Sequence, residues 1–267
     1  MLKNNVLSVF DSIGQRQIVL LKKYMLLAQM HSLNATFKRA LPDVASATDE
    51  ALLKSLLATY DHSTNAHAQR TVLFAEGLAY QLCLSEEEIF QVCLAALLHD
   101  IGKAGIPRAI LNKRGPLDEQ EWHLMRRHPE IGQQMLLLTG GPFARLAPVV
   151  VAHHERWDGG GYPAGLSGEQ IPLGARIIAV VDSYDAMTCR RVYNEPLSVA
   201  EACAELQRCA GSQYDPHVVA AFLLFLSEPT EHAERARHSL AGGGTGSAGV
   251  VFAAPSPRSG GCVPVSA

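Results

Sequence analysis

The feature that most constrains the fold is a succession of amphipathic helical segments between about residues 64 and 227. In the first segment, about 64–84, apolar residues recur every three or four positions, as one face of a helix requires. These residues are Val72, Ala75, Leu78, Ala79 and Leu82. The β-branched run 177–181 is by itself typical of a strand, but it lies inside a longer helical pattern at 173–186. The sequence therefore predicts an all-α fold.

Two acidic capping boxes mark where helices begin. Ser85 is followed three residues later by Glu88, a pair that can bond reciprocally to first-turn amides. This signal opens a helix that ends at His99-Asp100. Asp118 opens a second helix, which runs toward His128 and should break and restart at Pro129.

Further helices are predicted at 143–154, 198–210 and 216–227. The last has Asp215 as its cap and Pro216 at its first position, where proline is favoured. Between them, Asp158-Gly159-Gly160-Gly161-Tyr162-Pro163 is too rich in glycine for regular structure and is predicted to be a loop.

The chain divides into three parts. Residues 1–60 have helical spacing but no chemical motif, so they are predicted to form an N-terminal helical arm. Residues 61–228 hold the motif-bearing helices and form the main domain. Residues 229–267 are rich in Gly, Ser and Pro and are predicted to be a disordered tail.

Composition narrows the class of protein. With 267 residues, 48% of them hydrophobic, the chain can bury a core without disulfides, and its six cysteines include no CxxC pair. Its net charge of −3 argues against a nucleic-acid polymer as partner. The apolar run 18–27 is short and contains Lys22-Lys23, so we expect no membrane span and a cytoplasmic protein.

Histidines and aspartates gather at the predicted helix ends and inward faces. Imidazole and carboxylate together suit first-row transition metals, and donors from several facing helices suit a dinuclear centre in a helical bundle. Any one histidine is more often a surface or core residue than a ligand, so only the whole constellation points to a metal. The candidates are His67, His99, Asp100, His128, His153, His154 and Asp182.

Motifs in this constellation resemble those of the HD-GYP domain family. His99-Asp100-Ile101-Gly102-Lys103 resembles its HDxGK signature, and residues 153–163 resemble its HHExxDGxGYP motif. His128-Pro129 matches an intervening His-Pro, and Thr64, His67 and Arg70 resemble an early HxxR element. The segment 171–188 resembles an IP-RI-D-DA-T stretch, so the similarity covers about residues 60–225.

The resemblance implies an HD-superfamily helical bundle with two divalent metal ions, most often iron or manganese. It implies hydrolysis of cyclic di-GMP to pGpG, GMP or both, by attack of a metal-bridging hydroxide. It assigns one metal to His67, His99, Asp100 and Asp182, and the second to Asp100 with His128, His153 and His154. The family's third-metal glutamate is replaced by Ser63, which favours a two-metal centre.

The resemblance also assigns substrate contacts. Lys103 would meet a phosphoryl oxygen or the leaving group, and Arg191 a substrate phosphate. The Tyr162 ring would pack on a guanine or on a partner domain, such as a GGDEF-domain or another signalling protein. Asn194 stands where a basic residue often follows, so one phosphate contact is missing.

Three functions stay open at this point: an active cyclic di-GMP phosphodiesterase, a cyclic di-GMP receptor or interaction module, and an HD phosphohydrolase of another nucleotide. The intact ligand set favours the enzyme. Two alternatives also stay open for the N-terminal arm, namely a dimerisation helix, which would make a homodimer, and the remnant of a sensor connection.

Overall fold

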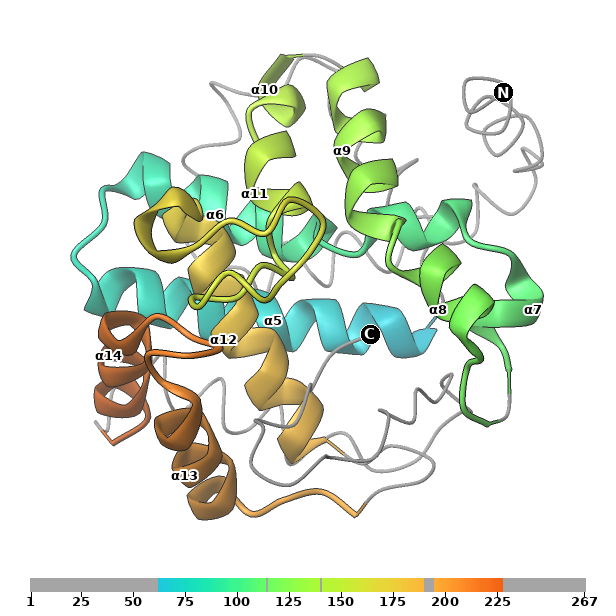
Figure 1. Cartoon of the computed structure of the whole chain (residues 1–267). Coiled ribbons are helices and arrows are strands. Elements are labelled where there is room, and N and C mark those ends of the chain that lie inside the picture. The colour runs from blue at the N-terminus through green and yellow to red at the C-terminus, as the bar shows by residue number, and fades with distance from the viewer. Residues whose placement is uncertain (1–61, 114, 140, 190–194, 228–267) are drawn as a thin grey trace.

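The computed structural model describes residues 62–113, 115–139, 141–189 and 195–227. Its regular elements are helical, and within the described residues two isolated bridges are the only β-pairing. The α-helices are α5 (His62–Gln81), α6 (Glu86–Leu98), α7 (Arg108–Leu111), α8 (Glu119–Met125), α9 (His128–Thr139), α10 (Gly141–Ala144), α11 (Ala147–Val151), α12 (Leu173–Thr188), α13 (Val199–Cys209) and α14 (Pro216–Ser227). Two 3-10 turns, η1 (Ile101–Gly105) and η2 (Gly168–Gln170), complete the set (Figure 1). The prediction of an all-α fold is confirmed.

Helix α5 lies at the centre of the molecule and contacts α6, α12 and α14 (Figure 1). Phe74, Tyr184 and Phe222, one from each of α5, α12 and α14, are fully buried and meet edge to face with centroids 5.1–5.9 Å apart. Such aromatic pairs add to the free energy of burial. This cluster fixes the frame from which the ends of α6, α8 and α11 project.

The predicted helix starts are present. Ser85 and Glu88 form a reciprocal capping box at α6, and Asp118 and Glu121 form another at α8. Helix α8 ends at Met125 and α9 begins at His128, so the break expected at Pro129 is confirmed. Each cap satisfies amides that the first helical turn leaves without partners.

The sequence predicts one helix at 143–154, but the structure has two short helices in this region. The segment expected to run from 143 into His153-His154 forms α10 and α11, which ends at Val151 and leaves both histidines in a turn. Pro148 lies in the first turn of α11, where its missing N–H costs nothing, whereas inside one continuous helix it would remove a hydrogen bond. The strand-like run 177–181 lies within α12.

The N-terminal arm (1–60), the tail (229–267) and the segment that contains Arg191 and Asn194 lie outside the described residues. No helix among those described has an apolar stretch long enough to cross a bilayer.

Candidate metal centre

Three histidines are held by the same local device at three helix ends. Nδ1 of His99 lies 2.7 Å from the carbonyl oxygen of Ala96, three residues earlier. His128 and His153 repeat the contact with the carbonyls of Met125 and Val150, at 2.9 and 2.6 Å. A carbonyl can only accept, so each Nδ1 carries the proton and each Nε2 presents a lone pair. Carbonyl groups in the last turn of a helix, which have no partner within the helix, therefore orient the three imidazole rings.

The lone pairs of His128 and His153 face one another. Their Nε2 atoms are 3.3 Å apart, and Nε2 of His154 lies 3.2 Å from that of His128. Burial lowers the pKa of His128 to about 3 and that of His153 to about 4, so both rings are neutral near pH 7. Neither of these two Nε2 atoms can donate to the other, and a cation between them would satisfy both lone pairs.

Asp100 lies between the group formed by His128, His153 and His154 and a second group, which contains His67 and His99. Its Oδ1 is 3.4 Å from Nε2 of His128, while its Oδ2 is 3.4 Å from Nε2 of His99. Ligand atoms of His128, His153 and His154 lie within 4.8 Å of one another, and so do those of His67, His99 and Asp100. One carboxylate thus reaches both triplets, which is the arrangement that a bridging ligand needs.

The second group is completed by α12. Nε2 of His67 lies 3.2 Å from Oδ1 of Asp182, and its Nδ1 lies 2.7 Å from Oδ2 of Asp185. Arg70 donates to both oxygens of Asp185, at 2.5 and 3.0 Å. Asp185 therefore orients a predicted ligand from behind, and Arg70 in turn fixes Asp185.

In the second group, His67 and its carboxylate neighbours stabilise one another's charged forms. Burial lowers the pKa of His67, but hydrogen bonds and charge attraction from Asp182 and Asp185 outweigh burial and raise it to about 9. Burial opposes ionisation of Asp182 as well, yet the bond and charge of His67 hold its pKa well below the usual range. His67 is thus an imidazolium between two carboxylates at neutral pH, and a metal would have to displace its Nε2 proton.

The donor set fits divalent transition metals. It combines neutral imidazoles with ionised carboxylates, a chemistry shared by iron, manganese and zinc sites. Within the described part of the chain, Nε2 of His99 is buried and has no hydrogen-bond partner. A buried polar atom without a partner is costly in the native state, and metal binding would remove that cost.

Lys103 forms an ion pair with Asp100, the carboxylate that lies between the two groups. Its Nζ donates to Oδ2 of Asp100 at 2.9 Å, and its side chain is 25% exposed. Burial raises the pKa of Asp100, but the attraction of surrounding groups, led by the Lys103 ammonium, outweighs burial and holds this pKa well below the normal value. The ammonium therefore keeps the carboxylate ionised and remains accessible from the site.

The glycine-rich loop is anchored by a buried carboxylate. Glu155 accepts from the amides of Ala164 and Gly165 through Oε1, at 2.7 and 3.1 Å, and from Leu166 through Oε2 at 3.1 Å. A Cβ at Gly161 would lie 2.3 Å from the amide nitrogen of Arg156, so only glycine allows this close approach. Glu155 thus folds the loop back onto the histidine turn.

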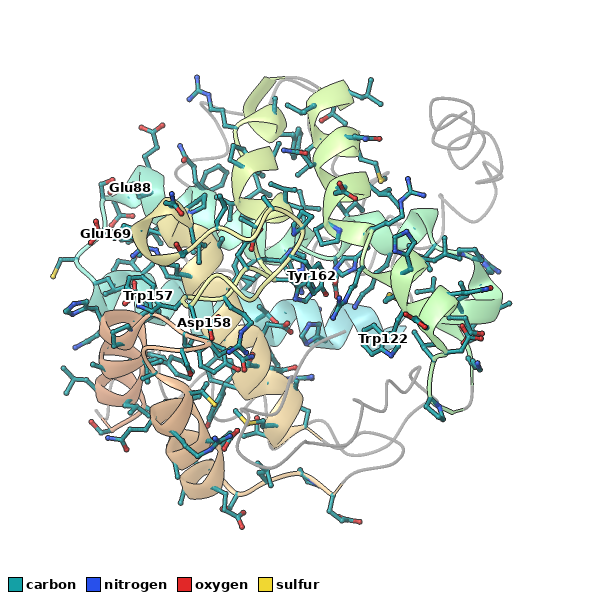
Figure 2. All side chains as sticks on the ribbon, viewed as in Figure 1. Glu88, Trp122, Trp157, Asp158, Tyr162 and Glu169 are labelled. Carbon is teal, nitrogen blue, oxygen red and sulfur yellow. The ribbon has the colours of Figure 1, made fainter. Side chains whose placement is uncertain are left out.

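This fold-back brings Tyr162, labelled near the centre of Figure 2, against His154, one of the candidate metal ligands. Its ring stacks on His154 with centroids 4.9 Å apart, and Cζ of Arg126 lies 5.1 Å from the ring centroid. The Tyr162 hydroxyl is buried and has no partner among the described residues. Burial raises its pKa, so it remains a donor near neutral pH.

The structure brings together nine of the predicted site residues, whereas Arg191 lies outside the described residues. The nine are His67, His99, Asp100, Lys103, His128, His153, His154, Tyr162 and Asp182. The sequence prediction gave no role to Asp185, Glu155 or Arg126. Asp185 could have been found, because it lies three residues after Asp182 and so shares its helical face.

Comparison with known proteins agrees with this geometry. Residues 51–218 match the family model described as HD domain. The chain is 41% identical over 179 residues to a cyclic di-GMP phosphodiesterase of Thermotoga maritima, covering 66% of this chain and 49% of that relative. It is 34% identical over 210 residues to the 3'3'-cGAMP-specific phosphodiesterase 2 of Vibrio cholerae, covering 77% and 40%.

A solved structure of an HD-GYP-type protein from Bdellovibrio bacteriovorus has the same fold. Its TM-score is 0.51 at 16% identity, covering 85% of this chain and 78% of that one. The chain spans about half the length, or less, of the two curated relatives above. The family match over residues 51–218, with the His-Asp and Gly-Tyr-Pro motifs in place, shows that the chain belongs to the HD domain family and, within it, to the HD-GYP type.

Proposed function

We propose that this chain is a metal-dependent phosphodiesterase that hydrolyses cyclic di-GMP to pGpG, GMP or both. The observation that carries the proposal is the pair of facing, neutral Nε2 atoms of His128 and His153 beside the Asp100 carboxylate. Neutral imidazoles aimed at one another in a buried site are a cost unless a cation joins them. Similar proteins named as cyclic di-GMP phosphodiesterases support the substrate class.

Two metal ions would be held by the two groups that Asp100 joins. His67, His99 and Asp182 would complete one site, and His128, His153 and His154 the other. These donors suit iron, manganese and zinc, and the resemblance to HD-GYP domains favours iron or manganese among them. When bound, such ions supply Lewis acidity and a water of lowered pKa for attack on phosphorus.

The chain's own residues would position and neutralise the substrate. Lys103, one helical turn after Asp100, would bind a phosphoryl oxygen or the departing 3' oxygen and offset its growing charge. Tyr162 has a protonated hydroxyl that would donate to substrate, and the loop held by Glu155 would exclude water from that side. Arg191 would meet a substrate phosphate, and the Gly-Tyr-Pro loop is the proposed contact for a GGDEF-domain or other signalling partner.

A second substrate is favoured by one comparison. The chain is similar to a protein named as specific for 3'3'-cGAMP, which shares the phosphodiester ring with cyclic di-GMP and differs in one base. The same metal centre would attack either molecule. The substrate test therefore includes both dinucleotides.

The test is hydrolysis by protein loaded anaerobically with Fe²⁺ or with Mn²⁺. Cyclic di-GMP and 3'3'-cGAMP are supplied separately, and pGpG, GMP and the mixed products are followed by anion-exchange chromatography. We expect turnover of cyclic di-GMP. Asp100→Asn, which keeps the side-chain shape but removes the charge, should lose metal and activity while retaining its helical circular dichroism.

The outcomes separate the alternatives. Tight binding of cyclic di-GMP without turnover under either metal would establish a receptor instead of an enzyme. Faster turnover of 3'3'-cGAMP than of cyclic di-GMP would reassign the substrate. Full activity in Asp100→Asn would show that the chemistry does not use this centre.

A further inference from the structure

A cation on the rim of the metal centre has no role in the function proposed above. Arg126 caps the C-terminal end of α8 and is solvent-exposed. Its guanidinium lies over the Tyr162 ring, and that ring stacks on His154. One aromatic ring therefore contacts both a permanent positive charge and an imidazole of the candidate metal site.

This guanidinium is free to take an anion. Across the described ranges the Arg126 guanidinium has no hydrogen bond or ion pair, whereas the guanidinium groups of Arg70, Arg156 and Arg176 each hold a carboxylate. A cation–π contact at an exposed position uses the face of the guanidinium and leaves its N–H groups unpaired. The fork that Arg126 presents matches the geometry of a phosphodiester.

The hydroxyl of the neighbouring Tyr162 also lacks an acceptor within the described part of the chain. It is buried and has no hydrogen-bond partner among the described residues. A native buried donor without an acceptor calls for an explanation, and a bound anion supplies one. Arg126 and Tyr162 together therefore offer a charge and a neutral donor to one acceptor.

We propose that Arg126, with the Tyr162 hydroxyl, binds the second phosphodiester of a cyclic dinucleotide, the one that is not being hydrolysed. This inference rests on the proposed function, because a ring with two phosphodiesters is what needs two anion sites. Lys103 and the metal ligands serve the reacting phosphate. Arg126 and Tyr162 serve its counterpart across the ring, so Arg126 is a binding residue that acts on affinity and not on the chemical step.

The experiment compares Arg126→Ala with the metal-loaded wild type on two substrates. We expect KM for cyclic di-GMP to rise about 10- to 100-fold, the range for loss of a charged hydrogen bond, with kcat within about twofold. Hydrolysis of bis(4-nitrophenyl) phosphate, which has a single phosphodiester, should change by less than about twofold. Arg145→Ala is the control, because Arg145 is an exposed arginine whose charge faces Glu87.

Further variants separate charge from structure. Arg126→Lys should recover part of the affinity because it keeps the charge and loses the fork. Tyr162→Phe keeps the ring but removes the hydroxyl, and should raise KM for cyclic di-GMP by a smaller factor than Arg126→Ala. An equal loss on both substrates in Arg126→Ala would show that Arg126 merely supports the loop, and would overturn the inference.

Binding measurements keep this test independent of turnover. If the wild type does not hydrolyse cyclic di-GMP, the proposed function fails, and the inference is then judged by calorimetric Kd. Equal Kd values for wild type and Arg126→Ala, or no binding at all, would refute it. The loss of affinity should be the same for cyclic di-GMP and cyclic di-AMP, whereas a loss confined to cyclic di-GMP would assign Arg126 to the guanine base instead.

Discussion

Nδ1 of His67 lies 2.7 Å from Oδ2 of Asp185, a carboxylate that the predicted ligand set does not include. The other nitrogen of the same ring faces Asp182 at 3.2 Å. One helix, α12, thus supplies both a candidate ligand and the residue that orients a neighbouring ligand. The three-residue spacing of the two aspartates puts them on one face, so His67 is held from both sides.

Asp185→Asn should weaken metal binding about 10- to 100-fold, because residues that orient a ligand typically contribute that much to affinity. Asparagine keeps the shape but removes the charge that fixes His67 and Arg70. Affinity is measured by competition with a chelating dye for Mn²⁺. Glu119→Gln, an exposed position on α8, is the control, and unchanged affinity in Asp185→Asn would contradict the role of Asp185.

Metal binding should release protons and strengthen as pH rises. The pKa of His67 is raised to about 9, so below that pH the imidazolium must lose its Nε2 proton before it can bind. Affinity should therefore increase from pH 6.5 to about 9 and then level off. His128 and His153, with pKa values of about 3 and 4, are already neutral over this range and add no such dependence.

Calorimetry in buffers of different ionisation enthalpy measures this proton release directly. At pH 7.5 we expect about one proton per protein from His67. His67→Gln should abolish it. An affinity that does not change between pH 7 and 9 would show that His67 is not an imidazolium in the folded protein.

Gly102→Ala should displace the candidate ligand His128 through a clash with its backbone. A Cβ at this position would lie 1.9 Å from the carbonyl oxygen of His128 and 2.5 Å from the amide nitrogen of Gly132, both in the first turns of α9. The backbone of α9 must move and carry His128 away from His153. We expect a loss of about 1–3 kcal/mol in the free energy of unfolding, together with loss of metal from the His128 group.

Gly132→Ala is the matched comparison for Gly102→Ala. Its Cβ would meet a Val150 methyl at 3.1 Å, which a small side-chain shift relieves. Alanine also favours the helix by about 0.5–1 kcal/mol relative to glycine, so stability should stay within about 1 kcal/mol of wild type. Thermal unfolding and metal content are read for both variants, and equal losses would argue against a specific clash at Gly102.

Glu155→Gln should loosen the glycine-rich loop. The amide group of glutamine places an N–H donor where the Leu166 amide needs an acceptor, so at least one of the three anchoring bonds is lost. We expect a loss of about 1–3 kcal/mol in stability and faster limited proteolysis between residues 156 and 170. Glu169→Gln is exposed in the same loop and should behave as wild type; identical proteolysis of the two would refute the anchor.

Helix starts could be predicted from the sequence because they depend on short-range patterns. The Ser85 and Asp118 capping boxes each form within four residues, and His99-Asp100 lies at the end of the helix that Ser85 opens. The run 177–181 was also assigned correctly to a helix, because its flanking pattern has helical spacing.

The roles of Asp185 and Arg126 could not be predicted from the sequence, because they depend on contacts between distant segments. Asp185 meets His67 across 118 residues, and Arg126 reaches Tyr162 only because Glu155 folds the loop back. Neither contact produces a periodic pattern of residues in the sequence. The break between α10 and α11 was missed for a local reason, since Pro148 in an apolar run can lie in the first turn of a new helix as well as in a kink.

The bonds from His99, His128 and His153 to carbonyls three residues earlier have a further consequence. Each ligand with its backbone acceptor is a self-contained four-residue fragment, so the aim of the ring is set before distant segments meet. The rotational freedom of these imidazoles is then lost on folding instead of on ion capture. Damage to such a centre would come from whole helix ends sliding apart and not from single rings turning away, which makes its geometry transferable to any helical framework that can bring three such ends together.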